Sequence, residues 1–387
     1  MRVFLVAGEA SGDKLGAALM TGLKSLTDVE FDGVGGPLMQ AEGLKSLFPM
    51  DELSVMGLAE VLPKYPELRR RLHQTANAVL DVQPDVLITI DSPDFGLRVA
   101  KLVKAKTSIR TVHYVAPSVW AWRPKRADKM AKVIDHVLAL LPFEPPYMQA
   151  AGMECDFVGH PVVEETLASD CEVRKFRNKF QLESRPVLLA LPGSRRGEVS
   201  RLSPIFGPAI SKFKRQNPNY EVVVPAAGAV ADLVKEQIGE WDVSAHVIDP
   251  NAYDLATAQA YKRAAFRAAD LALAASGTVS LELAAVETPM VIAYDFSLIT
   301  RFLMKRMALI DTATLVNLVS DTRVVPECLF ENCRADLIAD KLVEVQKNPN
   351  DQIAAMRLTM DSLGRGGEAP GLCAAKAVLT GITKSQT

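Results

Sequence analysis

The chain has 387 residues, which is too long for one ordinary hydrophobic core and suits two domains. Its residues are 49% hydrophobic and 23% charged, proportions that argue against a disordered or fibrous protein. Lys and Arg number 44 against 46 Asp and Glu, so the formal net charge is −2. We therefore expect no nucleic acid as a partner, because a nucleic-acid-binding domain needs a basic surface.

The five cysteines include no CxxC pair, which favours reduced thiols over a disulfide framework or a zinc site. The apolar run at 3–7 is too short for the core of a signal peptide. No apolar stretch approaches the roughly 18 residues of a membrane span. We expect a cytoplasmic protein that is at most peripheral on a membrane.

Short apolar runs alternate with amphipathic helical segments along the whole chain, which predicts α/β domains with parallel, doubly wound sheets. The expected strands of the first half are 3–7, 86–90, 110–115, 137–141 and 155–158. Those of the second half are 187–191, 221–224, 246–248, 271–274 and 291–294. A polar stretch near 161–170 separates the halves, so we expect domains at 1–166 and 167–387 that face a ligand cleft.

Two polar motifs directly follow strands in the first half. GEASGD at 8–13 lacks both the GxGxxG and the P-loop pattern, and its Glu9, Ser11 and Asp13 either form a capped helix start or line the cleft. Asp91, in IDSPDF, ends an apolar strand. A carboxylate at that place suits a general base, although a helix-capping role stays open.

An aromatic motif, HYVAPSVWAWR at 113–123, also follows a strand. Its Ser118, Trp120 and Arg123 could line a sugar or a lipid chain. A packed corner explains the tryptophans slightly better.

Two motifs of the second half together predict a nucleoside-diphosphate site. Gly193, Ser194 and Arg195 follow a strand and open a helix, where backbone N–H groups and a guanidinium favour a phosphate. Ser276, Gly277 and Thr278 offer further donors, and Glu282 lies one turn on, where it can accept ribose hydroxyls. A capping box from Thr278 would need a spacing of three rather than four.

A segment near 55–71 mixes apolar and basic side chains. Buried core is the default interpretation, and a patch that inserts into a membrane is the alternative. The residues concerned are Met56, Leu58, Val61, Leu62, Tyr65, Leu68, Arg69 and Arg70.

The motif set resembles the lipid-A-disaccharide synthases, bacterial glycosyltransferases with two Rossmann-like domains of the GT-B type. The resemblance rests on VAGEASGD, IDSPDF, HYVAPSVWAWRPKR, LPFE, FVGHP, LPGSRRGEV, ASGTVSLE and LVNLV, in that order along nearly the whole chain. PSVWAWR and GEASGD are specific, whereas ASGT with its following Glu is shared by many GT-B enzymes. Ser92 departs from the alanine that is common in the family.

The resemblance implies an inverting transfer of 2,3-diacylglucosamine from UDP-2,3-diacylglucosamine to 2,3-diacylglucosamine 1-phosphate (lipid X). The products would be the β-1,6-linked disaccharide 1-phosphate of lipid A and UDP. Asp91 corresponds to the general base, Arg195 to the diphosphate-binding arginine, and Asn317 to an asparagine at the UDP site.

The resemblance further implies a location on the inner face of the bacterial inner membrane, with the 55–71 segment contacting anionic phospholipid. We expect neither a metal nor another cofactor. The last helices, about 350–387, are expected to cross back to the first domain, and a homodimer is left open. Rival hypotheses are a UDP-sugar 2-epimerase, a transferase for a soluble acceptor, and a non-catalytic nucleotide-sugar-binding module.

Overall fold

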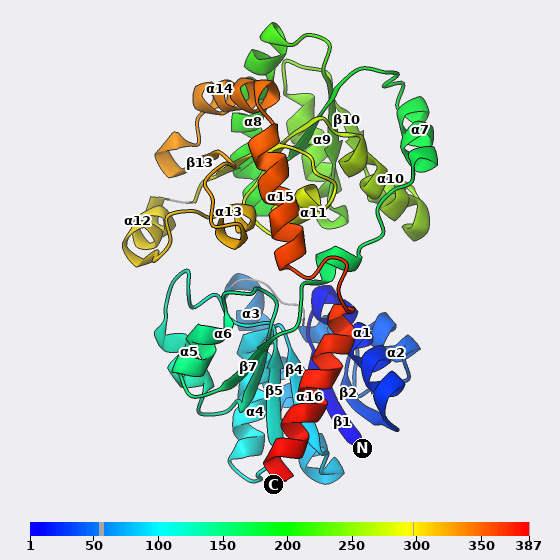
Figure 1. The fold of residues 1–387 in the computed structure, drawn as a ribbon, viewed down its shortest axis with the longest axis vertical. Helices are drawn as coiled ribbons and strands as arrows, with labels where there is room; N and C mark the ends of the chain where they lie inside the picture. Colours follow the sequence, from blue (N-terminus) through cyan, green and yellow to red (C-terminus); the bar gives the residue numbers. More distant parts are fainter. Residues whose placement is uncertain (54–57, 297, 387) are drawn as a thin grey trace. The chain divides into compact units, whose positions relative to one another are not determined.

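The computed structural model describes residues 1–53, 58–296 and 298–386, and the chain divides into two compact units (Figure 1). Unit 1 comprises residues 1–161 and 366–387, and unit 2 comprises 162–365. The first change of unit thus lies a few residues before the expected boundary at 166. Both units have parallel sheets with helices, so the expected α/β class with two doubly wound domains is confirmed.

Within the described residues, unit 1 is built on a seven-stranded parallel sheet in the order β3-β2-β1-β4-β5-β6-β7. Its strands are β1 (Arg2–Ala7), β2 (Glu30–Val34), β3 (Lys45–Ser46), β4 (Val86–Ile90), β5 (Arg110–Tyr114), β6 (His136–Ala139) and β7 (Glu154–Phe157). Its helices are α1 (Ala10–Leu26), α2 (Pro37–Ala41), α3 (Leu58–Val82), α4 (Pro93–Lys104), α5 (Lys125–Met130), α6 (Pro145–Ala150) and α16 (Pro370–Gln386).

The described part of unit 2 has a six-stranded parallel sheet in the order β10-β9-β8-β11-β12-β13. Its strands are β8 (Val187–Leu191), β9 (Glu221–Pro225), β10 (His246–Ile248), β11 (Leu271–Ala274), β12 (Met290–Tyr294) and β13 (Glu327–Leu329). Its helices are α7 (Asp170–Lys179), α8 (Arg196–Gln216), α9 (Ala231–Gly239), α10 (Leu255–Ala268), α11 (Val279–Ala285), α12 (Leu298–Met307), α13 (Leu315–Val319), α14 (Ala335–Lys347) and α15 (Asn350–Ser362).

Each sheet has one point at which the strand order reverses, between β1 and β4 in unit 1 and between β8 and β11 in unit 2. Open parallel sheets bind ligands beside the carboxyl ends of the strands at this switch point. The central strands β4, β5 and β8 are buried along their whole length, because helices cover both faces of such a sheet. The fold therefore leaves the loops after β1, β4, β8 and β11 as the candidate sites.

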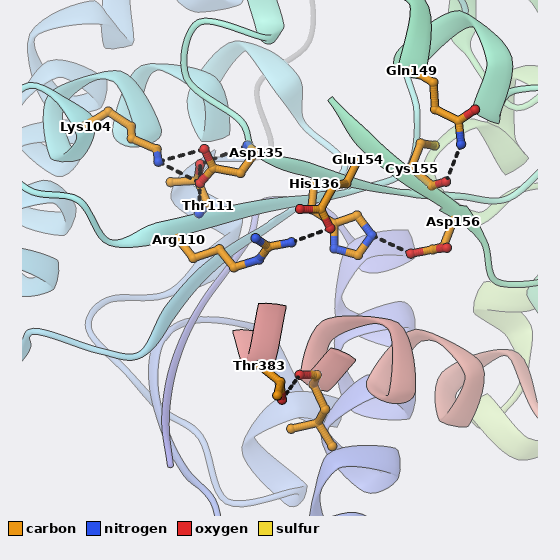
Figure 2. A network of polar contacts seen from close by, with 11 residues as sticks. Lys104, Arg110, Thr111, Asp135, His136, Gln149, Glu154, Cys155, Asp156 and Thr383 are labelled. Carbon is orange, nitrogen blue, oxygen red and sulfur yellow. Dashed lines mark hydrogen bonds and ion pairs between the residues drawn. The ribbon is translucent and has the colours of Figure 1, made fainter. Parts of the chain in front are cut away.

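Ion pairs link the strands β5, β6 and β7 of unit 1 (Figure 2). Arg110 on β5 donates to Glu154 on β7 at 2.8 Å, and the buried His136 contacts Asp156 at 2.8 Å. Burial lowers the pKa of His136 and outweighs the opposing effect of Asp156. Arg110, His136 and Glu154 are the first residues of their strands, away from the carboxyl edge, so we assign these contacts to the stability of the sheet.

The C-terminal stretch divides between the two units, unlike the expectation that 350–387 crosses back as a whole. Helix α15 stays in unit 2, where Thr359 donates to the carbonyl of Val316 at 3.3 Å. Helix α16 alone returns to unit 1 and packs along α1 (Figure 1). Glycines allow this close approach: a Cβ at Gly371 would lie 2.6 Å from the carbonyl oxygen of Ala18.

We predict that Gly371→Ala destabilises unit 1, because the added methyl group meets α1 backbone that cannot yield without separating the helices. The expected loss is about 1–3 kcal/mol in the free energy of unfolding. Urea unfolding and hydrogen exchange of α16 amides measure it. The matched control is Gly239→Ala, where no atom lies within 4 Å of the added Cβ. An unchanged or raised stability of Gly371→Ala would contradict this account of the helix contact.

Candidate functional site

Asp91 directly follows β4 at the switch point of unit 1. Its backbone N–H donates to the carbonyl of Tyr114 on β5 at 2.9 Å, which holds the residue at the carboxyl edge of the sheet. Asp91 has a φ of 52° and Ser92 a φ of 39°, so two consecutive non-glycine residues adopt the left-handed conformation. Such backbone costs roughly 1–3 kcal/mol per residue and gathers at functional sites. The local strain therefore supports a functional role for this turn.

The GEASGD motif lies against this turn, as expected of loops that flank one switch point. The Ser11 hydroxyl donates to Oδ2 of Asp91 at 3.0 Å, from the first turn of α1. A Cβ at Gly8 would lie 2.8 Å from Oγ of Ser92, so the close approach requires glycine. The structure thus joins two sequence-predicted motifs, and Ser11 orients a carboxylate that is only partly buried.

Asp13, for which the sequence analysis leaves a capping or a cleft-lining role open, bonds to the start of α2. The side chain is 3% exposed, and its carboxylate accepts backbone N–H groups of Gly36, Leu38 and Met39 at 2.9–3.0 Å. Three such bonds at the start of α2 commit the carboxylate to capping that helix. Glu9 precedes α1 and is half-buried.

The aromatic motif at 113–123 forms the loop after β5. Val115 has a φ of 86° and Arg123 a φ of 54°, and a positive φ is a genuine outlier for a β-branched residue. Ser118 is exposed, as is Arg123, whose guanidinium stacks 4.2 Å from the Trp122 ring. Trp120 is nearly buried, so the structure favours the packed corner for this side chain.

Glu144, which the sequence analysis did not single out, holds Trp120 in place. Its carboxylate accepts the indole N–H of Trp120 at 3.1 Å and the backbone N–H of Leu141 at 3.0 Å. The Trp120 ring also meets Phe143 edge-on, with 5.1 Å between centroids. Burial raises the pKa of Glu144 to about 7, and its hydrogen bonds oppose that rise only in part. The LPFE sequence marks the residue, but no pattern in the sequence reveals its burial.

In unit 2, the two phosphate-type motifs line one cavity of about 460 Å³ at the switch point. Gly193, Ser194 and Arg195 contribute from the loop after β8, and residues 276–278 contribute from the loop after β11. Glu282 lines the same cavity from α11, so the predicted donor-site residues come together, with one exception. Lys262 and Glu198 also line it, and the sequence analysis missed both.

Every charged side chain in this cavity has a partner of opposite charge. Lys262 on α10 lies 2.5 Å from Glu282, and Arg195 lies 3.4 Å from Glu198. Glu198 also accepts the backbone N–H groups of Ser194 and Arg195, at 3.1 and 3.3 Å. The sequence analysis expects these amides to hold a phosphate, but the protein's own carboxylate occupies them. The Arg195 side chain is 65% exposed and remains accessible to a ligand.

Asn317 is the exception among the predicted donor-site residues. It is 1% exposed, and its amide pairs with both the N–H and the carbonyl of Val325, each at 3.0 Å. It also donates to Thr312 at 3.2 Å. The structure therefore places Asn317 outside the cavity of Arg195, in a role that fixes the backbone after α13.

The expected membrane patch is described only in part. Met56 lies outside the described residues, and for Leu58, Val61 and Leu62 the structure gives only their place in α3. Tyr65 is 50% exposed, Leu68 is partly buried, and Arg69 and Arg70 are exposed. In the described ranges, no helix combines the length and apolar character that crossing a bilayer requires. No three metal-ligating side chains form a group there that could hold a metal ion.

Comparison with known proteins identifies relatives over the full chain. A family model described as lipid-A-disaccharide synthetase matches residues 3–375. The lipid-A-disaccharide synthase of Ruegeria pomeroyi is 64% identical over 380 residues, covering 98% of this chain and 95% of the relative. That of Rhodospirillum centenum is 45% identical over 392 residues, covering 99% and 95%.

Solved structures with the same fold are more distant in sequence. The UDP-GlcNAc 2-epimerase from Neisseria meningitidis bound to UDP-GlcNAc aligns with a TM-score of 0.63 at 13% identity, covering 99% of this chain and 100% of that one. The UDP-GlcNAc 2-epimerase of Methanocaldococcus jannaschii, in complex with UDP-GlcNAc and UDP, gives 0.59 at 14% identity, with coverage of 99% and 100%. At such identities the likeness shows the fold alone.

The raised pKa of Glu144 predicts a pH-dependent stability. The folded protein holds this proton up to about pH 7, whereas an unfolded glutamate releases it near 4.5. The free energy of unfolding should therefore fall as pH rises between these values and level off above them. Glu144→Gln, which cannot ionise, should lose this component. Unfolding midpoints of both proteins from about pH 5 to 8 measure it, and parallel curves would contradict the assignment.

Proposed function

This chain belongs to the lipid-A-disaccharide synthase family, and from that premise we propose how its residues perform the transfer. UDP-2,3-diacylglucosamine is the donor, and the 6-hydroxyl of 2,3-diacylglucosamine 1-phosphate (lipid X) is the acceptor. A bond forms between this oxygen and the anomeric carbon while the bond from that carbon to the diphosphate breaks. The products are the β-1,6-linked disaccharide 1-phosphate of lipid A and UDP.

Asp91 acts as the general base in this proposal. Its carboxylate takes the proton of the acceptor hydroxyl as the oxygen attacks, and attack opposite the leaving group inverts the anomeric carbon. The 3.0 Å hydrogen bond from Ser11 to Oδ2 leaves Oδ1 for the acceptor. The left-handed turn at Asp91 and Ser92, held by the bond to Tyr114, is the single observation that carries this role.

The cavity of unit 2 holds the UDP moiety in this proposal. Arg195 stabilises the charge that develops on the departing diphosphate, and the Gly277–Thr278 backbone adds donors. Gly277 has a φ of 155° and no atom within 4 Å of its Cβ position, so a phosphate can approach the backbone there. Glu282 accepts the ribose hydroxyls beside Lys262. No step of this mechanism requires a metal.

The direct test incubates the purified protein with UDP-2,3-diacylglucosamine and lipid X in detergent micelles. We expect disaccharide 1-phosphate and UDP in equal amounts by mass spectrometry, and no UDP without the acceptor. UDP release without disaccharide, or epimerisation of the donor sugar, would overturn the proposal.

Asp91→Asn tests the general base. The amide cannot accept the proton, so we expect kcat to fall by about 10²–10⁴-fold, with little change in the KM for the donor. The neighbouring Ser92→Ala is the matched control and should retain activity, because it changes the same strained turn without removing the carboxylate. Comparable activity of Asp91→Asn and the control would exclude the proposed role.

We also propose peripheral binding to the inner face of the bacterial inner membrane through the amino-terminal part of α3. The exposed Tyr65, Arg69 and Arg70 support this, since apolar insertion and basic residues act together at anionic bilayers. Arg69→Gln/Arg70→Gln should weaken binding to phosphatidylglycerol vesicles roughly thirtyfold, at about 1 kcal/mol per arginine.

Cosedimentation with vesicles measures this binding. The matched control, Arg174→Gln/Lys175→Gln on α7, removes two exposed positive charges from unit 2 and should bind like the unaltered protein. Equal loss in both double variants, or no loss in either, would rule out α3 as the contact.

A further inference from the structure

Glu198 is the residue of the unit 2 cavity that fits least well with binding a diphosphate. Its side chain is only 12% exposed, yet it lines the cavity. Besides the contacts with Ser194 and Arg195, its Oε1 accepts the hydroxyl of Tyr294, at the end of β12, at 3.1 Å. A carboxylate placed here repels the ligand that its neighbours attract, so it calls for an explanation beyond the capping of α8.

The surroundings of Glu198 hold the carboxylate where it is. It reaches back from α8 to the amides that precede the helix, and Tyr294 contacts it from a different element. Gly193 leaves the space that Glu198 fills, since a Cβ there would lie 2.5 Å from the Glu198 Cβ. Burial, with Glu198 as a smaller cause, raises the pKa of Tyr294 to about 12, so the phenol stays a neutral donor. A fixed, largely buried charge acts more strongly on a nearby ligand than an exposed one.

The charges of the cavity balance. Arg195 and Lys262 supply two positive charges, and Glu198 and Glu282 supply two negative ones. A nucleotide sugar carries one negative charge on each phosphate of its diphosphate. When the bond to the sugar breaks, the terminal phosphate loses its only ester bond and keeps the anhydride bond, so it gains a further negative charge above its second pKa near 6. The reaction therefore increases the negative charge of the ligand, and the side chains that line the cavity have no net positive charge to offset it.

We propose that Glu198 is a specificity-determining residue that makes this cavity bind the nucleotide-sugar ester in preference to the free nucleoside diphosphate. The Glu198 carboxylate repels the charge that appears on the terminal phosphate and so promotes release of the product. This inference rests on the proposed function, because it assumes that the cavity holds the UDP moiety.

The test compares dissociation constants for UDP and for UDP-2,3-diacylglucosamine in detergent micelles, by calorimetry at about pH 8 without acceptor. Glu198→Gln removes the charge and keeps the shape, so UDP should bind more tightly by roughly five- to tenfold relative to the donor. Tyr294→Phe is the matched control. It removes a contact of Glu198 and leaves the charge, so the ratio of the two constants should stay within about twofold of the unaltered protein.

The outcomes separate the two proposals. Unaltered protein that binds neither ligand would overturn both. Normal binding of both ligands with an unchanged ratio in Glu198→Gln, or the same change in Tyr294→Phe, would overturn the role of Glu198 alone.

A second measurement needs no variant and covers the case that Glu198→Gln does not fold. At about pH 5.5 the terminal phosphate of UDP takes up its proton, and the preference of the unaltered protein for the donor should shrink. The ionisable side chains that contact Glu198 are Arg195 and Tyr294, and burial raises the pKa of Tyr294 to about 12, so its phenol stays neutral over this range. A preference that is the same at both pH values would overturn the inference.

Discussion

The backbone hydrogen bond from Asp91 to Tyr114 extends the parallel sheet one residue beyond β4, and the candidate site of unit 1 depends on it. This bond fixes the point at which the chain leaves the sheet. The left-handed conformation of Asp91 and Ser92 then turns the chain into α4. The glycine opposite, Gly8, leaves room for that turn. A flexible loop would give the carboxylate many orientations, whereas this arrangement gives it few.

The switch point of unit 2 uses a different device. Here the loop after β8 is stabilised by a carboxylate of its own helix, and the positive charge in the cavity comes from side chains, because this carboxylate already occupies the amides. The two units thus share a topology and differ in how they prepare the loop at the switch point. Unit 1 presents a carboxylate on strained backbone, and unit 2 presents a guanidinium beside backbone N–H groups that are already hydrogen-bonded.

Strands buried on both faces were predictable because they are near-continuous apolar runs. The residues of β4, β8 and β11 match the expected ranges. The sequence analysis missed strand β2, because EFDGV is not an apolar run. The reason for a glycine at position 33 is visible only from the neighbouring strand β1. Any Cβ at Gly33 would collide with the carbonyl of Leu5. The hydrophobic pattern of a sequence indicates which residues are buried beneath helices. It does not indicate backbone contacts between neighbouring strands, such as the one at Gly33.

The sequence predicted where the residues of the candidate sites lie better than it predicted what their side chains contact. Strand ends located Asp91 in unit 1 and the loops at 193 and 276 in unit 2, because topology places each at the carboxyl edge of its own sheet. Asp13, Glu198 and Asn317 show the limit. Each is a polar residue in a recognisable motif, and the motif does not tell whether its side chain contacts a ligand or the protein's own backbone. The partners of Asp13 are in another element, and those of Asn317 come from residues outside the LVNLV motif. Glu198 is near in sequence to the amides that donate hydrogen bonds to it, whereas the hydroxyl of Tyr294 that also donates to it comes from β12.

The return of α16 to α1 has a consequence for how the protein is made. Unit 2 is one continuous stretch, residues 162–365, so all of it is synthesised before α16. The face of α1 that receives α16, with Gly22 and Ala18, stays uncovered until then. Order of synthesis thus differs from order of completion: the part of the chain translated first is the last to acquire all of its native contacts.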